Sequence, residues 1–277
     1  MFTSEIASNK AGITAATDKK TYQVLGIDIS DYSRDEFFSL VENRLKNNDP
    51  DMPPAFVVTV NPEIVIQSIT DNDFKHILTT SSINTADGIG IRWAINFLYG
   101  KNLDRITGSD SLEKICAICA RHRQPVFLYG ARPTVADKAA DTLKGRIENL
   151  EVNGTYSPDD VSTPVEDLPP VTQTQLTSSP VVFVALGAPG QEKWIYSNLH
   201  KLPGCKLIIG IGGSFDFLAG TVKRAPDWMC SIGLEWMYRL TIQPSRWKRM
   251  LKLPLFALNV MLLKSSSKNG QNIPKPE

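Results

Sequence analysis

Short apolar runs alternate with longer amphipathic stretches along most of the chain. The runs at 56–60, 125–131, 180–190 and 206–218 are rich in β-branched residues and end in polar or glycine-bearing loops, which predicts buried strands. The segments between them carry apolar residues at helical spacing. Strand–helix alternation of this kind is typical of a mainly parallel sheet with helices on both faces. We therefore expect an α/β fold.

Local signals divide the chain further. Residues 22–30 look like a strand, and Ser33 with Glu36 forms a capping-box pattern that predicts a helix from about residue 34. The stretch 159–180 is rich in Pro, Thr and Ser, which indicates a long surface loop with one short helix. From about residue 225 onward the pattern is helical only. We expect a disordered segment at 1–20, an α/β core at 21–224, a helical appendage at 225–264 and a disordered tail at 265–277.

Composition narrows the class of protein. The 277 residues are 42% hydrophobic with a net charge of +1, so the chain as a whole is no nucleic-acid-binding polycation. Cys116 and Cys119 have the CxxC spacing of a redox or zinc half-site, but they lie in an apolar helical pattern without a second pair. We expect all four cysteines to be reduced thiols of a cytoplasmic protein. No signal-peptide pattern opens the chain, and no apolar run approaches the roughly 20 residues that span a bilayer.

Two polar loops follow apolar segments in the region 56–91. Thr59 and Asn61 lie at the end of the first strand, and Pro62 then opens a helix; Asp87 lies in the second loop, before Gly88. Ligands of open α/β sheets bind beyond the carboxyl ends of strands, so these side chains form a candidate site with a possible base. Taken locally, Asp-Gly is a common turn dipeptide, and Thr59 and Asn61 could simply cap a helix.

Another acidic pattern, at residues 71–73, has the DxD form of many metal-dependent glycosyltransferases. It falls at the end of a predicted helix with no strand before it, so we interpret it as a solvated turn. We expect no metal site there.

Three predicted strands end in glycine-bearing loops, at 129–131, 186–191 and 210–214. Glycine allows a phosphate or sugar to approach the backbone closely, so the three loops together indicate nucleotide binding. Ordinary turn chemistry remains the better interpretation of the first loop. The third is not a dinucleotide fingerprint, because Asp216 stands where the last glycine would be, and the chain has no P-loop pattern.

The C-terminal segment differs from the rest in charge. From Lys223 to Lys264 there are eight Lys and Arg against two acids, interleaved with tryptophans and followed by the apolar run LPLFALNVMLL. Basic charge, interfacial aromatics and a short apolar stretch favour helices that lie on an anionic membrane. Packing of the apolar run on the core is the alternative. Nucleic-acid binding would leave that run unexplained.

These motifs together resemble the WecG/TagA/CpsF family of bacterial glycosyltransferases. In family order, the matching segments are TVNPEIV, NTADGIGIRW, FLYGARP, VALGAPGQEKW, GIGGSFDFLAG and GLEWMYRLTIQPSRWKRM. The resemblance implies a Rossmann-like core and inverting, metal-independent transfer of an N-acetylmannosamine-type sugar from UDP to a polyprenyl-diphosphate-linked N-acetylglucosamine. Together with the basic, aromatic C-terminal segment, this activity leads us to expect a cytoplasmic protein bound peripherally to the inner face of the cell membrane through that segment.

The resemblance assigns roles to individual residues. It implies Asp87 as the catalytic residue, with Thr59 and Asn61 in the same site, and it places three arginines in the appendage, Arg239, Arg246 and Arg249. We expect Asp87 to act as general base, Thr59 and Asn61 to orient the sugar or acceptor, and the arginines to stabilise the UDP charge or hold the acceptor diphosphate. Candidate substrate-binding residues are Asn84, Gly130, Gly187, Gln191, Gly212, Gly213 and Asp216.

Several alternatives stay open at this stage. The donor could carry another hexose or a uronic acid. A nicotinamide-dependent oxidoreductase, a non-catalytic membrane adaptor and a homo-oligomeric assembly are further possibilities. No nucleic-acid partner and no cofactor are expected.

Overall fold

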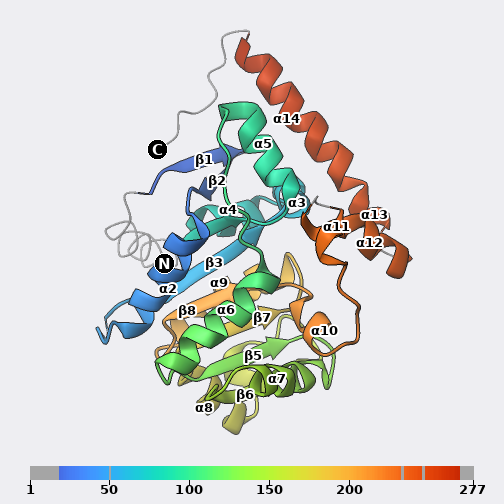
Figure 1. Ribbon diagram of the computed structural model, residues 1–277. Coiled ribbons are helices and arrows are strands. Elements are labelled where there is room, and N and C mark those ends of the chain that lie inside the picture. The colour runs from blue at the N-terminus through green and yellow to red at the C-terminus, as the bar shows by residue number, and fades with distance from the viewer. Residues whose placement is uncertain (1–18, 50, 232–233, 245–246, 269–277) are drawn as a thin grey trace.

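In a computed structural model, the chain forms a six-stranded parallel sheet with helices on both faces (Figure 1). The structure describes residues 19–49, 51–231, 234–244 and 247–268. Of the segments 1–20 and 265–277, where we expected disorder, residues 1–18 and 269–277 lie outside this set, whereas residues 265–268 form the end of the last helix. The strands in sheet order are β4 (Ile83–Ala86), β3 (Ala55–Val60), β8 (Leu207–Gly210), β7 (Val181–Ala185), β5 (Val126–Gly130) and β6 (Val152–Tyr156). The expected α/β architecture with a parallel sheet is confirmed.

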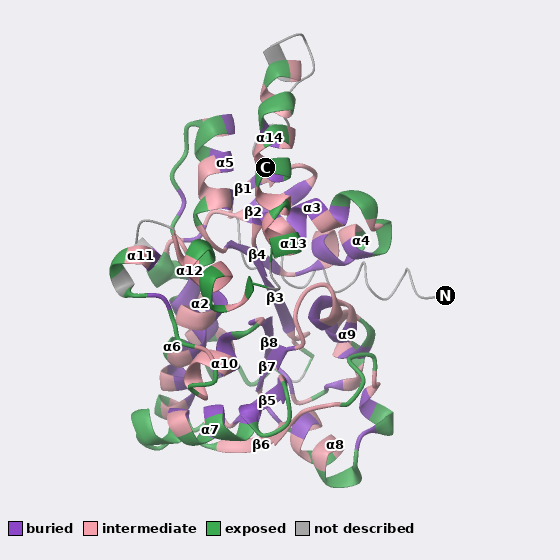
Figure 2. Cartoon of the chain, turned by 90° about the vertical axis from the view of Figure 1, so that its right-hand side faces the viewer, coloured by how far each residue is buried: buried purple, intermediate pink, exposed green. Residues whose placement is uncertain are grey.

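Two apolar clusters, one on each face of the sheet, form the core. Residues of β3, β4, β5, β7 and β8 are almost entirely buried (Figure 2). Burial on both faces explains why all of these strands except β4, which contains Asn84 and Thr85, read as apolar runs. One face is covered by α2 (Arg34–Lys46), α6 (Gly108–Arg121), α7 (Val135–Arg146) and α10 (Ser214–Leu218). The other is covered by α3 (Pro62–Thr70), α4 (Asn72–Thr80), α5 (Ile89–Tyr99), α8 (Pro170–Thr177) and α9 (Gly190–Asn198).

Local sequence signals set several element boundaries. The Ser33 hydroxyl accepts from the Glu36 N–H and the Glu36 carboxylate accepts from the Ser33 N–H, so the predicted capping box of α2 is confirmed. Pro62 is the first residue of α3, as expected. Asp71 ends α3 and caps α4, and its carboxylate also accepts from Lys193 of α9. This acidic turn therefore stabilises the junction between α3 and α4 and connects it to α9.

Two expectations need correction, and a third is confirmed. Residues 22–30 are not one strand but the antiparallel hairpin β1 (Thr21–Val24) and β2 (Ile27–Ser30), because Leu25 and Gly26 adopt positive φ and reverse the chain. The loop at 159–180 contains two short helical pieces, η1 (Val165–Asp167) and α8, where one was expected. The four cysteines are free and buried, as expected.

The C-terminal segment is helical throughout its described part, with α11 (Asp227–Ser231), α12 (Glu235–Ile242), α13 (Trp247–Met250) and α14 (Lys252–Lys268). Helix α14 packs on α3 and α5, and it contributes Phe256 and Val260 to the core. Its opposite side exposes Leu255, Leu258 and Leu262. In the described part of the chain, no helix combines the length and apolar character needed to cross a membrane.

Candidate active site

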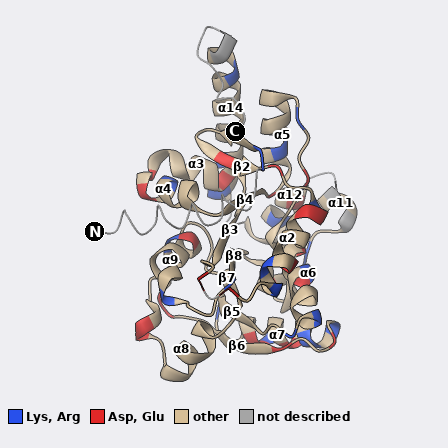
Figure 3. Cartoon of the chain, turned by 90° about the vertical axis from the view of Figure 1, so that its left-hand side faces the viewer, with Lys and Arg blue, Asp and Glu red and all other residues tan. Residues whose placement is uncertain are grey.

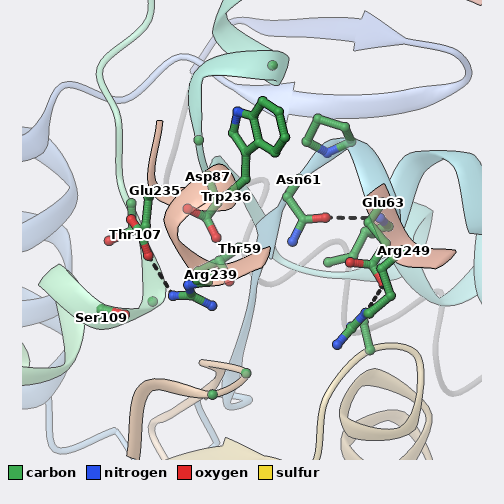
Figure 4. A pocket seen from close by; sticks show the side chains of 18 of the residues that line it. Thr59, Asn61, Glu63, Asp87, Thr107, Ser109, Glu235, Trp236, Arg239 and Arg249 are labelled. Carbon is green, nitrogen blue, oxygen red and sulfur yellow. Dashed lines mark hydrogen bonds and ion pairs between the residues drawn. The ribbon is translucent and has the colours of Figure 1, made fainter. Parts of the chain in front are cut away.

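A cavity of about 640 Å³ lies at the carboxyl ends of four adjacent strands, β4, β3, β8 and β7. The loops that follow these strands form its floor and sides, and α12, α13 and the start of α14 form the remaining wall. This is the position at which open α/β sheets bind ligands, and the volume is that of a small-molecule site. The cavity therefore brings the two polar loops of residues 56–91 together with the C-terminal helices (Figure 4).

Backbone geometry holds Asp87 in this cavity. Its N–H donates to the Val60 carbonyl at 2.8 Å, which extends the pairing of β4 with β3 beyond the strand end. Gly88 has a φ of +86° and starts α5 directly after Asp87. A Cβ on Gly90 would stand 2.4 Å from Cγ of Pro62, so glycine is required where the starts of α5 and α3 meet. The strand pairing at Val60 and the two glycines therefore determine both the turn after β4 and the position of the Asp87 carboxylate.

The environment of Asp87 raises its pKa to about 7. Burial is the main cause and the nearby negative charge of Glu235 adds to it, whereas Arg239 and Arg105 act in the opposite direction. Asp87 is only partly exposed, toward the cavity. A carboxyl group with a pKa near neutrality can exchange a proton with a bound ligand at physiological pH.

Thr59 and Asn61 lie beside Asp87, and both already have structural partners. The Thr59 hydroxyl donates to the Gly210 carbonyl at 3.1 Å and so connects β3 with the end of β8. Asn61 caps α3 by accepting from the Ile64 N–H at 3.1 Å. Because the cap uses its Oδ1, the Nδ2 of Asn61 is left to face the cavity (Figure 4). Asn61 can therefore cap α3 and face the cavity at the same time.

Two appendage arginines reach the cavity, and each is held by a carboxylate. Arg239 donates to Glu235 at 2.6 Å and lies over the Phe217 ring at 4.5 Å. Arg249 donates to Glu63, at the start of α3, also at 2.6 Å. Both arginines line the cavity (Figure 4). Arg246, the third arginine of the sequence prediction, lies outside the described residues.

A hydrogen-bonded chain supports the glycine loop after β8. The Gly212 N–H donates to Oε1 of Gln191 at 3.0 Å, and Nε2 of Gln191 donates to Glu192 at 2.7 Å. A Cβ on Gly210 would stand 2.6 Å from that Nε2, so the Gln191 amide packs directly against the loop. Glu192 is fully buried, its second carboxylate oxygen has no partner among the described residues, and burial raises its pKa to about 7.

The structure separates the predicted substrate-binding residues into two groups. Two of them, Asn84 and Gly130, do not line the cavity. Asn84 is committed to Ser81, Asp28 and Leu78 through its side chain, and Gly130 is required because a Cβ would stand 2.8 Å from the Ala185 backbone. The residues that do line the cavity are Gly187, Gln191, Gly212, Gly213 and Asp216.

Sequence reasoning missed three charged residues of the cavity, Glu63, Arg105 and Glu235. Arg105 donates to the Cys230 carbonyl at 3.1 Å and to Asp110 at 3.3 Å, which ties the loop before α6 to α11. Its only local signal was its position shortly before Thr107, the N-cap of α6. Glu235 could have been noticed from its i,i+4 spacing to Arg239, the usual geometry of a helical ion pair.

Comparison with known proteins identifies the family of the chain. The model of the glycosyl transferase WecG/TagA/CpsF family matches residues 22–270. An N-acetylglucosaminyldiphosphoundecaprenol N-acetyl-beta-D-mannosaminyltransferase of Bacillus subtilis (strain 168) is 38% identical over 224 residues, which is 80% of this chain and 84% of that protein. A Staphylococcus aureus (strain MRSA252) protein of the same name is 28% identical over 90% of this chain and 95% of its own length. The chain therefore belongs to the glycosyl transferase WecG/TagA/CpsF family.

Proposed function

We propose that the protein transfers an N-acetylmannosamine-type sugar from UDP to a polyprenyl-diphosphate-linked N-acetylglucosamine, in the assembly of a cell-surface polysaccharide or teichoic acid. The names of the similar proteins supply the transferred sugar and the lipid-linked acceptor. The UDP donor and the inverting course come from the family resemblance of the motifs.

The observation that carries the proposal is the carboxyl group of Asp87, with a pKa of about 7, in a cavity that also contains Arg105, Arg239 and Arg249. An acceptor hydroxyl must lose its proton as its oxygen bonds to the anomeric carbon. In this mechanism Asp87 takes that proton while the bond from the anomeric carbon to the β-phosphate oxygen breaks, and UDP leaves with the electron pair. A single displacement of this kind inverts the anomeric centre.

The guanidinium groups in the cavity suit the departing diphosphate. Charge develops on the β-phosphate as the sugar leaves, and positioned guanidinium groups stabilise such charge best when water is excluded. Arg239 and Arg249 are now paired with Glu235 and Glu63, so diphosphate binding would exchange one anionic partner for another. The glycine loop at Gly212 and Gly213 also lines the cavity and allows close backbone approach of a ligand.

The test is transfer from UDP-N-acetylmannosamine to a synthetic diphosphate-linked N-acetylglucosamine. Asp87→Asn should lower kcat by at least a hundredfold, because the amide accepts no proton. Asp141→Asn, the same change on the exposed surface of α7, serves as the matched control and should behave as wild type. Near-normal turnover of Asp87→Asn would refute the assignment of the base.

We further propose that the protein binds the inner face of the cell membrane peripherally. The C-terminal helices expose Trp228, Trp236, Trp247 and Leu251 beside basic residues, a combination suited to an anionic lipid surface. Co-sedimentation with anionic vesicles measures this directly. Trp247→Ser should weaken sedimentation, whereas Val171→Ser, on α8 at the other end of the sheet, should not.

A further inference from the structure

An apolar stripe on α5 leaves the cavity along one face of that helix. Ile89 and Trp93 line the cavity, and Phe97 follows at the same four-residue spacing, so the three side chains share a face. Trp93 and Phe97 stack with ring centroids 5.5 Å apart. Ile89 is 47% exposed and Phe97 39% exposed, so the stripe is open to solvent at both ends.

Helix α14 runs beside this stripe (Figure 1). Ala257 of α14 lines the cavity, and Lys264 donates to the Leu98 carbonyl at 2.7 Å with its Nζ 5.8 Å from the Phe97 ring. Met261 lies between these two points on the same face of α14 and is 50% exposed. The facing residues of the two helices are therefore apolar from the cavity up to Lys264.

We define the apolar strip as Ile89, Trp93 and Phe97 on α5 together with Ala257 and Met261 on α14. Its α5 side extends about 12 Å, from eight residues at 1.5 Å each. None of these five residues is charged, and the ribbons of α5 and α14 are tan for most of their length in Figure 3, whereas the cavity contains Arg239 and Arg249. The cavity and the apolar strip together therefore match a ligand whose anionic head is attached directly to an apolar chain.

We propose that the apolar strip binds the first isoprenoid units of the acceptor, next to its diphosphate. This inference rests on the proposed function, because it takes the acceptor to be a prenyl diphosphate derivative. A ligand that places its sugar hydroxyl at Asp87 and its phosphates near the arginines must direct the attached chain out of the cavity. The strip is an apolar surface that begins inside the cavity, so burial of the chain there favours binding. The apolar strip contacts the acceptor directly, so this contribution to binding does not require a bilayer.

The experiment compares soluble acceptors that differ only in chain length, without vesicles or detergent. N-acetylglucosamine diphosphate is esterified with a methyl group or with a geranyl group, and kcat/KM is measured at saturating UDP-N-acetylmannosamine. Wild type should prefer the geranyl acceptor by about tenfold or more, which corresponds to about 1.4 kcal/mol. Phe97→Ser and Met261→Ser should each bring that ratio close to one. Val171→Ser, an exposed valine on α8, should keep the wild-type ratio.

Each other outcome is decisive. A wild-type ratio near one, or an unchanged ratio in Phe97→Ser, overturns the inference and leaves the proposed function intact. A preference that arises only after vesicles are added also overturns it and favours a bilayer contact instead.

Absence of transfer to any acceptor would refute the proposed function. The shift in melting temperature on ligand binding would then test separately whether the apolar strip binds an isoprenoid chain. Greater stabilisation by geranyl diphosphate than by inorganic diphosphate, lost in Phe97→Ser, would support the strip. Equal stabilisation by the two ligands would overturn it.

Discussion

Replacement of Asp87 by asparagine should make the protein more stable while it removes activity. Burial of this carboxyl group raises its pKa from the ordinary value of 3.8 to about 7. The folded state therefore binds a proton more tightly than the unfolded state, and stability falls as pH rises between these two values. Above pH 7 both states are ionised, so the full penalty of the buried charge is present. Below pH 4 both are protonated and the penalty vanishes.

The pKa difference sets the size of the effect. It corresponds to a penalty of about 4 kcal/mol at pH 8 and about 1.7 kcal/mol at pH 5. Asparagine has no charge to bury, so the free energy of unfolding of Asp87→Asn should exceed that of wild type by more at pH 8 than at pH 5. The expected change in that excess is about 2.5 kcal/mol.

Urea unfolding at the two pH values measures this difference. Equal m-values in variant and wild type would show that the same surface is exposed on unfolding. Asp141→Asn, exposed on α7, is the control and should show no such pH-dependent excess. An Asp87→Asn excess that is the same at pH 5 and pH 8 would mean that the pKa of Asp87 is not raised, and the proposed base would lose its physical support.

Three further predictions concern the residues around Asp87. Turnover should rise with pH through a midpoint near 7, and Glu235→Gln should move that midpoint to lower pH in a kcat profile, because one cause of the raised pKa of Asp87 is removed. Glu192→Gln keeps an acceptor for the Gln191 amide and should retain turnover, whereas Glu192→Met should raise the donor KM several-fold at similar thermal stability; equal KM values would refute a positioning role. Arg249→Ala should lower kcat/KM by about ten- to a hundredfold, the range for a charged hydrogen bond, while Arg146→Ala in a surface ion pair leaves it unchanged.

The parts of the fold that follow local rules could be predicted from the sequence. The capping box at Ser33, the helix start at Pro62 and the continuous apolar runs of the central strands each depend on neighbours within a few residues. The β1–β2 hairpin was missed because its turn, Leu25-Gly26, lacks the usual Asn-Gly or Asp-Gly signature, and Leu25 adopts positive φ although it is not glycine.

The candidate site likewise has residues that the sequence pattern predicted and residues that it did not. Asp87, Thr59 and Asn61 were found because parallel strands place their carboxyl ends at one edge, so residues after β3 and β4 must be neighbours. Asn84 does not line the cavity because it precedes that edge: it lies within β4, where its amide donates to carbonyls of β2 and α4. Arg105 and Glu235 were missed because their positions depend on how loops and C-terminal helices fold back, which no local pattern encodes.

The C-terminal helices are better regarded as a wall of the active site than as an attachment to a finished core. Phe256 of α14 both lines the cavity and belongs to the core cluster that includes α3 and α5. Glu235 of α12 helps to raise the pKa of Asp87, while Arg239 of the same helix opposes that shift. Removal of everything after residue 225 would therefore expose core surface and change the acidity of the proposed base at once. A truncated protein that lost both activity and lipid binding could not separate these effects, whereas single substitutions at Trp247, Glu235 and Phe97 can.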